Sequence, residues 1–374
     1  MKFIHTADWQ LGMTRHYFDE DGAARFSEAR ETAIRRIGEV AREQDAQFVV
    51  VAGDVFEHSM SRPRTVRRAL EAMKTISVPV FLLPGNHDPI GVESVYRSSI
   101  FVAEKPDNVH VIENETPFLV DSHVELVGIP WTSKQMIEDR VAACLRALPP
   151  ADGRLRVMVA HGQTAGMGDL NNLGRIDLDA VDDAIRAGRL HYLALGDRHS
   201  TTRCDDAGRV WYSGAPEPTD YDEDDPGNVL LVDVDRRAVT VTRIPVGTWR
   251  FLEETLQLRQ REAVSQVRAL LAGVADKQRT VVKLHFAGTI GLDDQLALDE
   301  FLNEQRQVFG AIERHLHRDR LAIMPPTGGF EDLKVSGYAR EALDELLSEA
   351  TQEGPNDGPF HDALALYYRL ARGV

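Results

Sequence analysis

Residues that could bind a metal follow five separate apolar segments of the chain. The segments are FIHT, FVVVAG, FLLPG, VMVA and YLALG, and the residues that come just after them are Asp8, Asp54, Asn86, His87, His161, Asp197 and His199. Strand ends in layered α/β folds converge at one edge, so we expect these groups to lie close together. Carboxylates, an amide and imidazoles gathered there could coordinate two divalent cations that share one carboxylate and clamp a phosphoryl group.

The elements that must position these residues alternate along the first 250 residues between short apolar strands and helical patterns. This alternation is the signature of an α/β layered domain. Apolar residues recur at three-to-four spacing over 34–41 and 66–73, which predicts helices there. The expected strands are Phe3–Thr6, Phe48–Ala52, Val80–Leu83, Val124–Ile129, Val157–Ala160, Tyr192–Leu195, Val229–Asp233 and Val239–Ile244.

The sequence changes character after about Gly247. Helical and strand patterns alternate again and predict a small α+β module, with elements expected over 264–274, 282–286, 298–308 and 321–324. The stretch PPTGG that follows is typical of a linker, and two helical patterns come after it over 338–350 and 360–371. We therefore expect a catalytic domain over 1–246, a capping domain over 247–328 and a helical tail over 329–374.

The charge balance argues against a polyanionic partner. The chain has 43 Lys and Arg against 59 Asp and Glu, which gives a formal net charge of −16. Nucleic-acid binders usually carry a basic surface, because phosphate neutralisation dominates their affinity. A local basic face or a partner subunit that holds the polymer remains open. The run Glu217–Asp225 holds six acids and no base, and we expect it to be a solvated loop.

The cysteines and the hydropathy of the chain indicate the cellular compartment in which the protein is expected. Cys144 and Cys204 form no CxxC pair, which argues against a disulfide framework and against a thiolate metal site. No stretch approaches the roughly 18 apolar residues of a membrane span. The opening MKFIHTADW lacks the apolar run of a signal peptide. We therefore expect a cytoplasmic protein without a membrane partner.

The ordered set D-x-(H/Q), GD, GNHD, H and G(H/D)xH resembles the calcineurin-like metallophosphoesterases. GDVF and PGNHDP carry this resemblance most strongly, and HTADWQLG is similar to the opening of SbcD-type DNA repair nucleases. The motifs cover roughly residues 1–245, and beyond them the likeness is architectural. The resemblance implies a four-layer α/β/β/α sandwich with an α+β cap and a helical tail. It also implies hydrolysis of DNA phosphodiester bonds by a metal-bound hydroxide, and an SMC-type coiled-coil ATPase as partner; a homodimer is compatible with it.

Carried over residue by residue, the resemblance implies a role for each motif residue. Asp54 would bridge two metals; Asp8, Gln10 and His199 would complete the first site, and Asn86, His161 and Asp197 the second. His87 would protonate the leaving alkoxide, a role suited to a group that titrates near neutrality. Family members commonly have His at positions 10 and 197. The oxygens found here favour Mn²⁺ or Mg²⁺ over nitrogen-preferring ions, and they leave the first site with fewer strong ligands.

Several alternatives stay open. The motifs favour a nuclease, whereas the net charge favours an enzyme acting on a phosphomonoester, a cyclic nucleotide or a nucleotide. A metal-impaired scaffold that binds a partner ATPase is supported only by Gln10, which could be a ligand or a bystander, and by Asp197. In the tail, Phe360, Leu364, Tyr367 and Leu370 form a stripe that could pack on the cap or dock a partner. Trp131 is expected to pack in the core or at a domain junction. His5, His58, His110, His123 and His191 are expected to be satisfied or exposed histidines and not ligands.

Overall fold

The chain folds into two compact units. The computed structural model describes residues 1–164, 174–314, 320–324, 330, 333, 335–353 and 359–372, so the linker predicted over 325–329 lies outside the described residues. The first unit comprises Met1–His16 and Ala23–Trp249, and the second comprises Tyr17–Gly22 and Arg250–Val374. No helix in the described ranges is both long and apolar enough to span a membrane.

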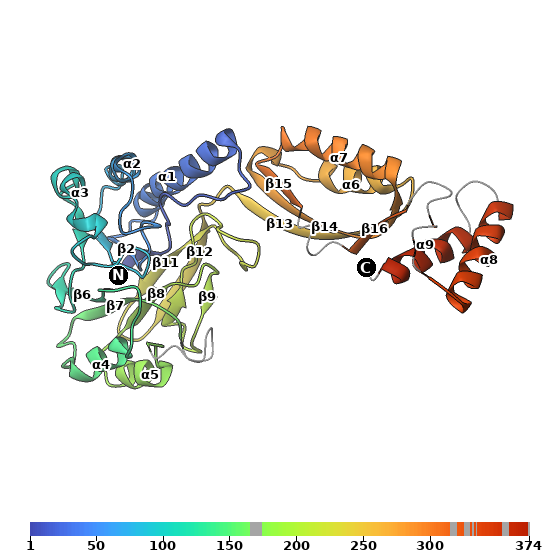
Figure 1. The fold of residues 1–374 in the computed structure, drawn as a ribbon. Coiled ribbons are helices and arrows are strands. Elements are labelled where there is room, and N and C mark those ends of the chain that lie inside the picture. The colour runs from blue at the N-terminus through green and yellow to red at the C-terminus, as the bar shows by residue number, and fades with distance from the viewer. Residues whose placement is uncertain are drawn as a thin grey trace. The chain divides into compact units, whose positions relative to one another are not determined.

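The first unit is built on two six-stranded sheets (Figure 1). The first sheet has the order β12 (Val239–Pro245), β11 (Asn228–Val234), β1 (Lys2–Thr6), β2 (Val49–Val51), β3 (Val80–Leu82) and β4 (Val109–Val111). The second has the order β5 (Phe118–Leu119), β6 (Val124–Ile129), β7 (Leu155–His161), β8 (Tyr192–Gly196), β10 (Val210–Tyr212) and β9 (Thr202–Arg203). β1 to β4 pair in parallel, as do β6, β7, β8 and β10, so their carboxyl ends share one edge.

Helices cover the outer face of each sheet, which confirms the predicted four-layer α/β/β/α sandwich (Figure 1). The helices over the first sheet are α1 (Glu20–Glu43), α2 (Pro63–Met73) and α3 (Ser99–Glu104), with the short 3₁₀ turn η1 (Val95–Arg97) before α3. Those over the second sheet are α4 (Arg140–Ala147) and α5 (Leu178–Arg186).

Strands of this unit are apolar throughout because both of their faces are buried. In β2, Val49 and Val51 pack in the core beneath α1 and α2, whereas Val50 packs in the core between the two sheets. A third core, which contains Val127 and Met158, lies beneath α4 and α5. Each such side chain contributes about 1.5–3 kcal/mol by leaving water, so the cores hold the strand ends in fixed positions.

The second unit contains a four-stranded parallel sheet with β14 (Thr280–Gly291) at its centre. The other elements are β13 (Arg250–Leu258), α6 (Ala263–Ala272), η2 (Lys277–Arg279), α7 (Leu292–Arg306), β15 (Ala311–Arg314), β16 (Arg320–Met324), α8 (Tyr338–Glu353) and α9 (Pro359–Arg372). α6 and α7 pack on the sheet through one apolar core. A separate core joins α8 and α9 to Ala322 and Met324 of β16.

Candidate metal centre

The predicted metal ligands lie at the carboxyl ends of strands from both sheets. β1, β2 and β3 lead into Asp8, Asp54 and Asn86, and these three strands are parallel neighbours in the first sheet. In the second sheet β7 ends at His161, and Asp197 follows its parallel neighbour β8. Because the two sheets pack face to face through a common core, the five side chains meet at one edge of the sandwich.

The backbone is strained at this edge. Asp8, Gln10, Asp54 and Asp197 have φ angles of 53°, 46°, 52° and 98°. Left-handed conformations of residues other than glycine cost about 1–3 kcal/mol each and cluster at functional sites. The Asp8 N–H donates to the Gly53 carbonyl and the Gln10 N–H to the Asp54 carbonyl, both at 3.0 Å, so the loops after β1 and β2 brace each other.

His161 is the centre of the buried cluster. Its Nδ1 lies 2.8 Å from the carbonyl oxygen of Ala52, which can only accept, so Nδ1 carries a proton and Nε2 faces the other site residues. Nε2 lies 2.8 Å from Asn86 Oδ1, 3.4 Å from Asp54 Oδ2 and 3.7 Å from Asp197 Oδ1. One ligand atom each from Asp8, Asp54 and His161 falls within 4.8 Å of the others. Such a set of electron-rich atoms requires a shared proton or cation.

Gln10 and His199 form the other side of the cluster. Nε2 of His199 lies 3.0 Å from Gln10 Nε2 and 3.9 Å from Asp8 Oδ1. Nδ1 of His199 contacts Glu223 Oε1 at 3.0 Å and Thr219 Oγ1 at 2.6 Å, which turns Nε2 toward the site. Gln10 Oε1 is buried and has no hydrogen-bond partner among the described residues. A divalent cation fits this donor set, because it would satisfy the orphaned oxygen and the neighbouring carboxylate together.

The charged groups of the cluster shift one another's pKa values. Burial raises the pKa of Asp8 to about 7, against the opposing charges of His199 and His161. Burial disfavours a charged His161, but the Asp54 carboxylate raises the pKa of this imidazole well above its usual value. His199 has a pKa raised to about 9, because its hydrogen bond to Glu223 and the charge of Asp8 outweigh its burial. Protons on the two imidazoles offset part of the negative charge of the carboxylates, and a divalent cation would offset more of it.

His87 lies at the exposed rim of the site. Its side chain is 38% exposed, and it lines a pocket of about 280 Å³ together with Gln10, Arg15 and Asp197. The backbone N–H of His87 donates to Asp54 Oδ1 at 3.0 Å, and the ring nitrogen Nδ1 lies 3.1 Å from the carbonyl oxygen of Glu57. Nε2 is 3.9 Å from Asp54 Oδ2. His87 is therefore fixed at the site while one ring nitrogen remains available to a substrate.

Two carboxylates that support the site were not identified from the sequence. Asp88 is fully buried and accepts hydrogen bonds from the N–H groups of Gly85 and Phe56 and from the hydroxyl of Tyr96. It thereby fixes the turn that carries Asn86 and His87. The Asp of the NHD motif is the sequence feature that could have identified it.

The second carboxylate, Glu223, belongs to the acidic run. The prediction that this run is solvated is wrong for Glu223, whose side chain is 5% exposed, and for Glu217. The Glu217 side chain is buried and accepts from Thr248 and Trp249.

Two residues that were not expected to be ligands, His5 and Trp131, pack in the interior. His5 is buried, contacts the Tyr192 hydroxyl and the Leu195 carbonyl, and has a pKa lowered by burial to about 3, so it is neutral. Trp131 is buried, and its indole N–H donates to the carbonyl of His161 at 2.7 Å. Trp131 thus packs in the core and positions His161 at the same time.

A four-layer sandwich with this cluster at its strand ends is the arrangement of a metal-dependent phosphoesterase. A profile described as calcineurin-like phosphoesterase matches residues 1–229, and the chain belongs to this family. All eight residues singled out from the sequence lie within the matched range, and the structure brings them together.

Two curated relatives are nucleases or repair proteins by name. The chain is 41% identical over 91 residues to the DNA double-strand break repair protein Mre11 of Archaeoglobus fulgidus, covering 24% of this chain and 19% of that protein. It is 26% identical over 266 residues to an SbcCD nuclease subunit of Rhodobacter capsulatus, covering 60% and 64%. The chain thus spans less than two thirds of either relative. A solved dimetal phosphatase from Danio rerio is 13% identical with a TM-score of 0.40, covering 64% of this chain and 98% of that one.

The raised pKa values of the imidazoles predict a pH-dependent metal affinity. A metal must displace the proton that His199 retains up to about pH 9, so Mn²⁺ should bind chelator-stripped protein more tightly as the pH rises toward that value. Calorimetric titrations in two buffers of different ionisation enthalpy give both the affinity and the protons released. Affinity that is independent of pH, with no proton release, would contradict the assignment of His161 and His199 as ligands.

A second prediction concerns Gly85, which precedes Asn86. A Cβ at this position would lie 2.1 Å from Asp54 Oδ1 and 2.5 Å from Asp54 N, so Gly85→Ala must displace the central carboxylate. We expect phosphoesterase activity to fall by about 100-fold, the effect of a misplacement near 1 Å, together with metal stoichiometry. Gly91→Ala is the matched control, because its new Cβ would meet only the Thr132 carbonyl oxygen at 4.0 Å. Equal activity in the two variants, both folded by circular dichroism, would refute the close-approach argument.

Proposed function

We propose that this chain is a two-metal DNA phosphodiesterase that prefers Mn²⁺ to Mg²⁺. The observation that carries the proposal is the convergence of residues from five strand ends, in two sheets, on one buried cluster beside an open pocket. The similarity to a DNA double-strand break repair protein and to a nuclease subunit supports DNA as the substrate.

The cluster divides into two groups that could each hold one cation, with Asp54 between them. The first group is Asp8, Gln10 and His199, and the second is Asn86, His161 and Asp197. When bound, the cations would neutralise phosphate oxygens and lower the pKa of a water molecule. The amide oxygens and the three carboxylates form a hard donor set, which supports Mn²⁺ or Mg²⁺ as the ion.

His87 would act on the leaving group. Because Nδ1 is oriented by the Glu57 carbonyl, Nε2 is the nitrogen that can face a substrate in the pocket. A protonated Nε2 would donate to the oxygen that departs from phosphorus, which is the work of a general acid. Arg15 lines the same pocket and adds a positive charge that would attract the phosphate.

Substitutions at Asp54 and His87 separate metal binding from proton transfer. Asp54→Asn should remove both metal binding and hydrolysis of bis-p-nitrophenyl phosphate, because the central carboxylate is lost. His87→Gln should keep the metal content while turnover falls by about 10²–10⁴, the usual size of a lost general acid. Metal analysis and steady-state kinetics on the same preparations test both. A drop in metal content with His87→Gln would make His87 a ligand, and full activity of Asp54→Asn would end the two-metal proposal.

A phosphatase of small substrates is the second candidate, favoured by the net charge of −16. The same kinetic assay distinguishes the two. The nuclease proposal requires a higher kcat/KM on a single-stranded oligonucleotide than on cyclic nucleotides or phosphomonoesters. The reverse order would establish the small-substrate enzyme.

We also propose that α9 docks a partner ATPase, through a surface that shares only Leu370 with the stripe expected from the sequence. Leu364 and Tyr368 are buried in the core shared with α8, so Leu364 belongs to the fold. Leu366 and Leu370 are 50% and 72% exposed and lie one turn apart on α9. Apolar residues at this spacing suit a helix-in-groove contact.

Charged substitutions on α9 test this contact better than a truncation. Removing residues 330–374 would also strip the partners of Ala322 and Met324 in β16. Leu366→Asp with Leu370→Asp should abolish co-purification with an SMC-type ATPase, whereas hydrolysis of the small diester should stay unchanged. Leu296→Asp is the control, since Leu296 is an equally exposed leucine on α7 (61%). If both variants bind the ATPase as the parent does, α9 is not the docking element.

A further inference from the structure

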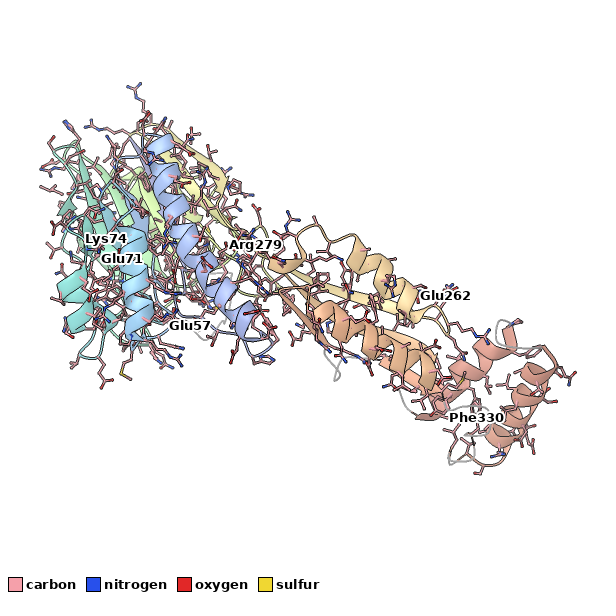
Figure 2. All side chains as sticks on the ribbon, turned by 90° about the horizontal axis from the view of Figure 1, so that it is seen from above. Glu57, Glu71, Lys74, Glu262, Arg279 and Phe330 are labelled. Atoms are coloured by element: carbon pink, nitrogen blue, oxygen red, sulfur yellow. The ribbon has the colours of Figure 1, made fainter. Side chains whose placement is uncertain are left out.

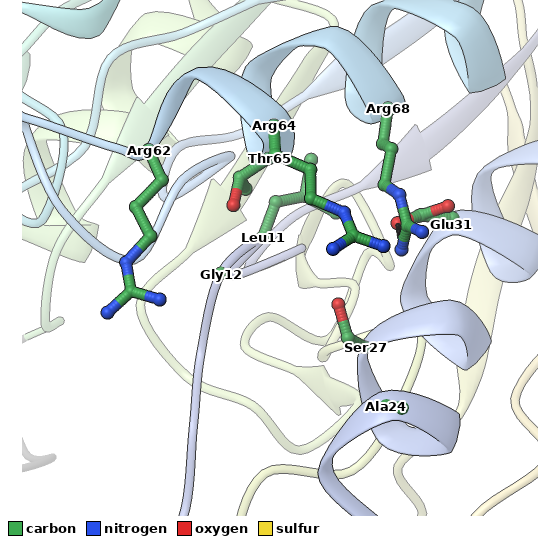
Figure 3. Close-up of a pocket in the computed structure, with 9 residues that line it drawn as sticks. All are labelled: Leu11, Gly12, Ala24, Ser27, Glu31, Arg62, Arg64, Thr65 and Arg68. Atoms are coloured by element: carbon green, nitrogen blue, oxygen red, sulfur yellow. Dashed lines mark hydrogen bonds and ion pairs between the residues drawn. The ribbon is translucent and has the colours of Figure 1, made fainter. Parts of the chain in front are cut away.

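A second pocket in the first unit lies between α1 and the N-terminal end of α2 (Figure 3). Its volume is about 240 Å³, and it is lined by three arginines, Arg62, Arg64 and Arg68, against a single carboxylate, Glu31. None of the predicted metal ligands lines it. The pocket is therefore a cationic site separate from the metal centre.

Two of the three arginines keep their charge available to a ligand. Arg68 Nη1 lies 3.3 Å from Glu31 Oε1, so the positive charge of Arg68 is neutralised by the carboxylate of Glu31. Arg62 and Arg64 are exposed, and neither pairs with a carboxylate among the described residues. Figure 3 shows the guanidinium group of Arg64 pointing toward α1, on the side where the Ser27 hydroxyl points back. The pocket thus combines uncompensated guanidinium groups with a hydroxyl.

The start of α2 adds to the positive potential. Arg62 occupies the N-cap position and Pro63 follows, and no side chain in the described ranges caps this end of the helix. Helix N-termini carry partial positive charge and outward N–H donors, here those of Arg64 and Thr65. The side chain of Thr65 also lines the pocket. Guanidinium groups, hydroxyls and backbone N–H donors together are the donors that bind tetrahedral oxyanions.

Positive charge is concentrated at this end of α2. At the other end Glu71 and Lys74 pair with each other (Figure 2), and Arg67 Nε contacts Oε1 of Glu104 in α3 at 2.9 Å. In a chain with a net charge of −16, these pairs leave Arg62 and Arg64 as a local basic feature on an acidic background.

One loop links the pocket to the metal centre. Gln10 lines the metal pocket, and Leu11 and Gly12, which follow it directly, line the arginine pocket. Gly12 has a φ of 94°, and a Cβ there would lie 3.2 Å from Thr65 Cγ2, so the loop is held tightly against the start of α2. A ligand that extends along this loop would contact both sites.

We propose that the arginine pocket binds a backbone phosphate of the polynucleotide at a distance from the bond that is cut. The inference rests on the proposed DNA function. Exposed guanidinium groups are screened by water and salt and hold a small free anion weakly. A strand already held at the metal centre presents its next phosphates at a high effective concentration, so a polymer benefits from the pocket far more than inorganic phosphate does.

The test uses the full chain carrying Arg62→Gln and Arg64→Gln together, with Arg67→Gln as the matched control on the same helix. With Mn²⁺, hydrolysis of bis-p-nitrophenyl phosphate should be unchanged in all three proteins. The KM for a single-stranded oligonucleotide should rise about tenfold in the double variant alone. The slope of log KM against log salt should fall by about 0.7, the value for one lost phosphate contact on a single strand.

Each alternative gives a different result. An unchanged KM in the double variant, or an equal rise in Arg67→Gln, overturns the arginine pocket while leaving the DNA function intact. If the parent protein cleaves the small diester but neither binds nor cleaves the oligonucleotide, the DNA function itself fails. Thermal stabilisation of the parent by inorganic pyrophosphate that the double variant loses, without any effect on the oligonucleotide, identifies a free phosphate site and overturns the backbone assignment.

Discussion

The structure depends on the burial of like charges. Asp8 and Asp54 are 1% and 2% exposed, and Asp197 joins them at the same edge of the sandwich. Carboxylates brought together in a medium of low dielectric repel strongly unless positive charge accompanies them. His161 and His199 provide part of that charge through their raised pKa values, and a divalent cation can provide the rest. Cations are therefore expected to bind at this cluster, because they reduce the repulsion between its buried carboxylates.

Holding such a cluster requires support from parts of the chain that bind nothing themselves. His161 is oriented by the Ala52 carbonyl, and His199 is oriented by Glu223, so each imidazole presents a fixed nitrogen. Asp88 ties the turn after β3 to the loop after β2 by accepting from the Phe56 N–H, and it also accepts from the Gly85 N–H and the Tyr96 hydroxyl. The strained φ angles persist because these bonds and the packed cores around them determine the geometry.

The parts of the site that could be predicted from the sequence are those that depend on local pattern. Apolar runs that end in Asp54 or His161 are visible without a structure, because both faces of these strands are buried. The two-residue strands β5 and β9 are too short to leave a pattern. The acidic run was predicted to be solvated from its charge alone, because Trp249, which donates to Glu217, and His199, which contacts Glu223, lie elsewhere in the sequence. The arginine pocket could not be predicted from the sequence, because residues of α1, far from α2 in the sequence, line it together with the arginines of α2.

The position of β1 in the first sheet has a consequence for biosynthesis. β1 pairs antiparallel with β11, Lys2 opposite Asp233, and the N-terminal amine donates to the Val234 carbonyl at 3.1 Å. A ribosome must therefore deliver the last strands of the unit before the first can pair on that side. At about 5–20 residues per second, this delay is on the order of ten seconds or more. Until then the nascent chain carries an unpaired strand edge, a template for misassociation, although every proposed metal ligand has already been synthesised.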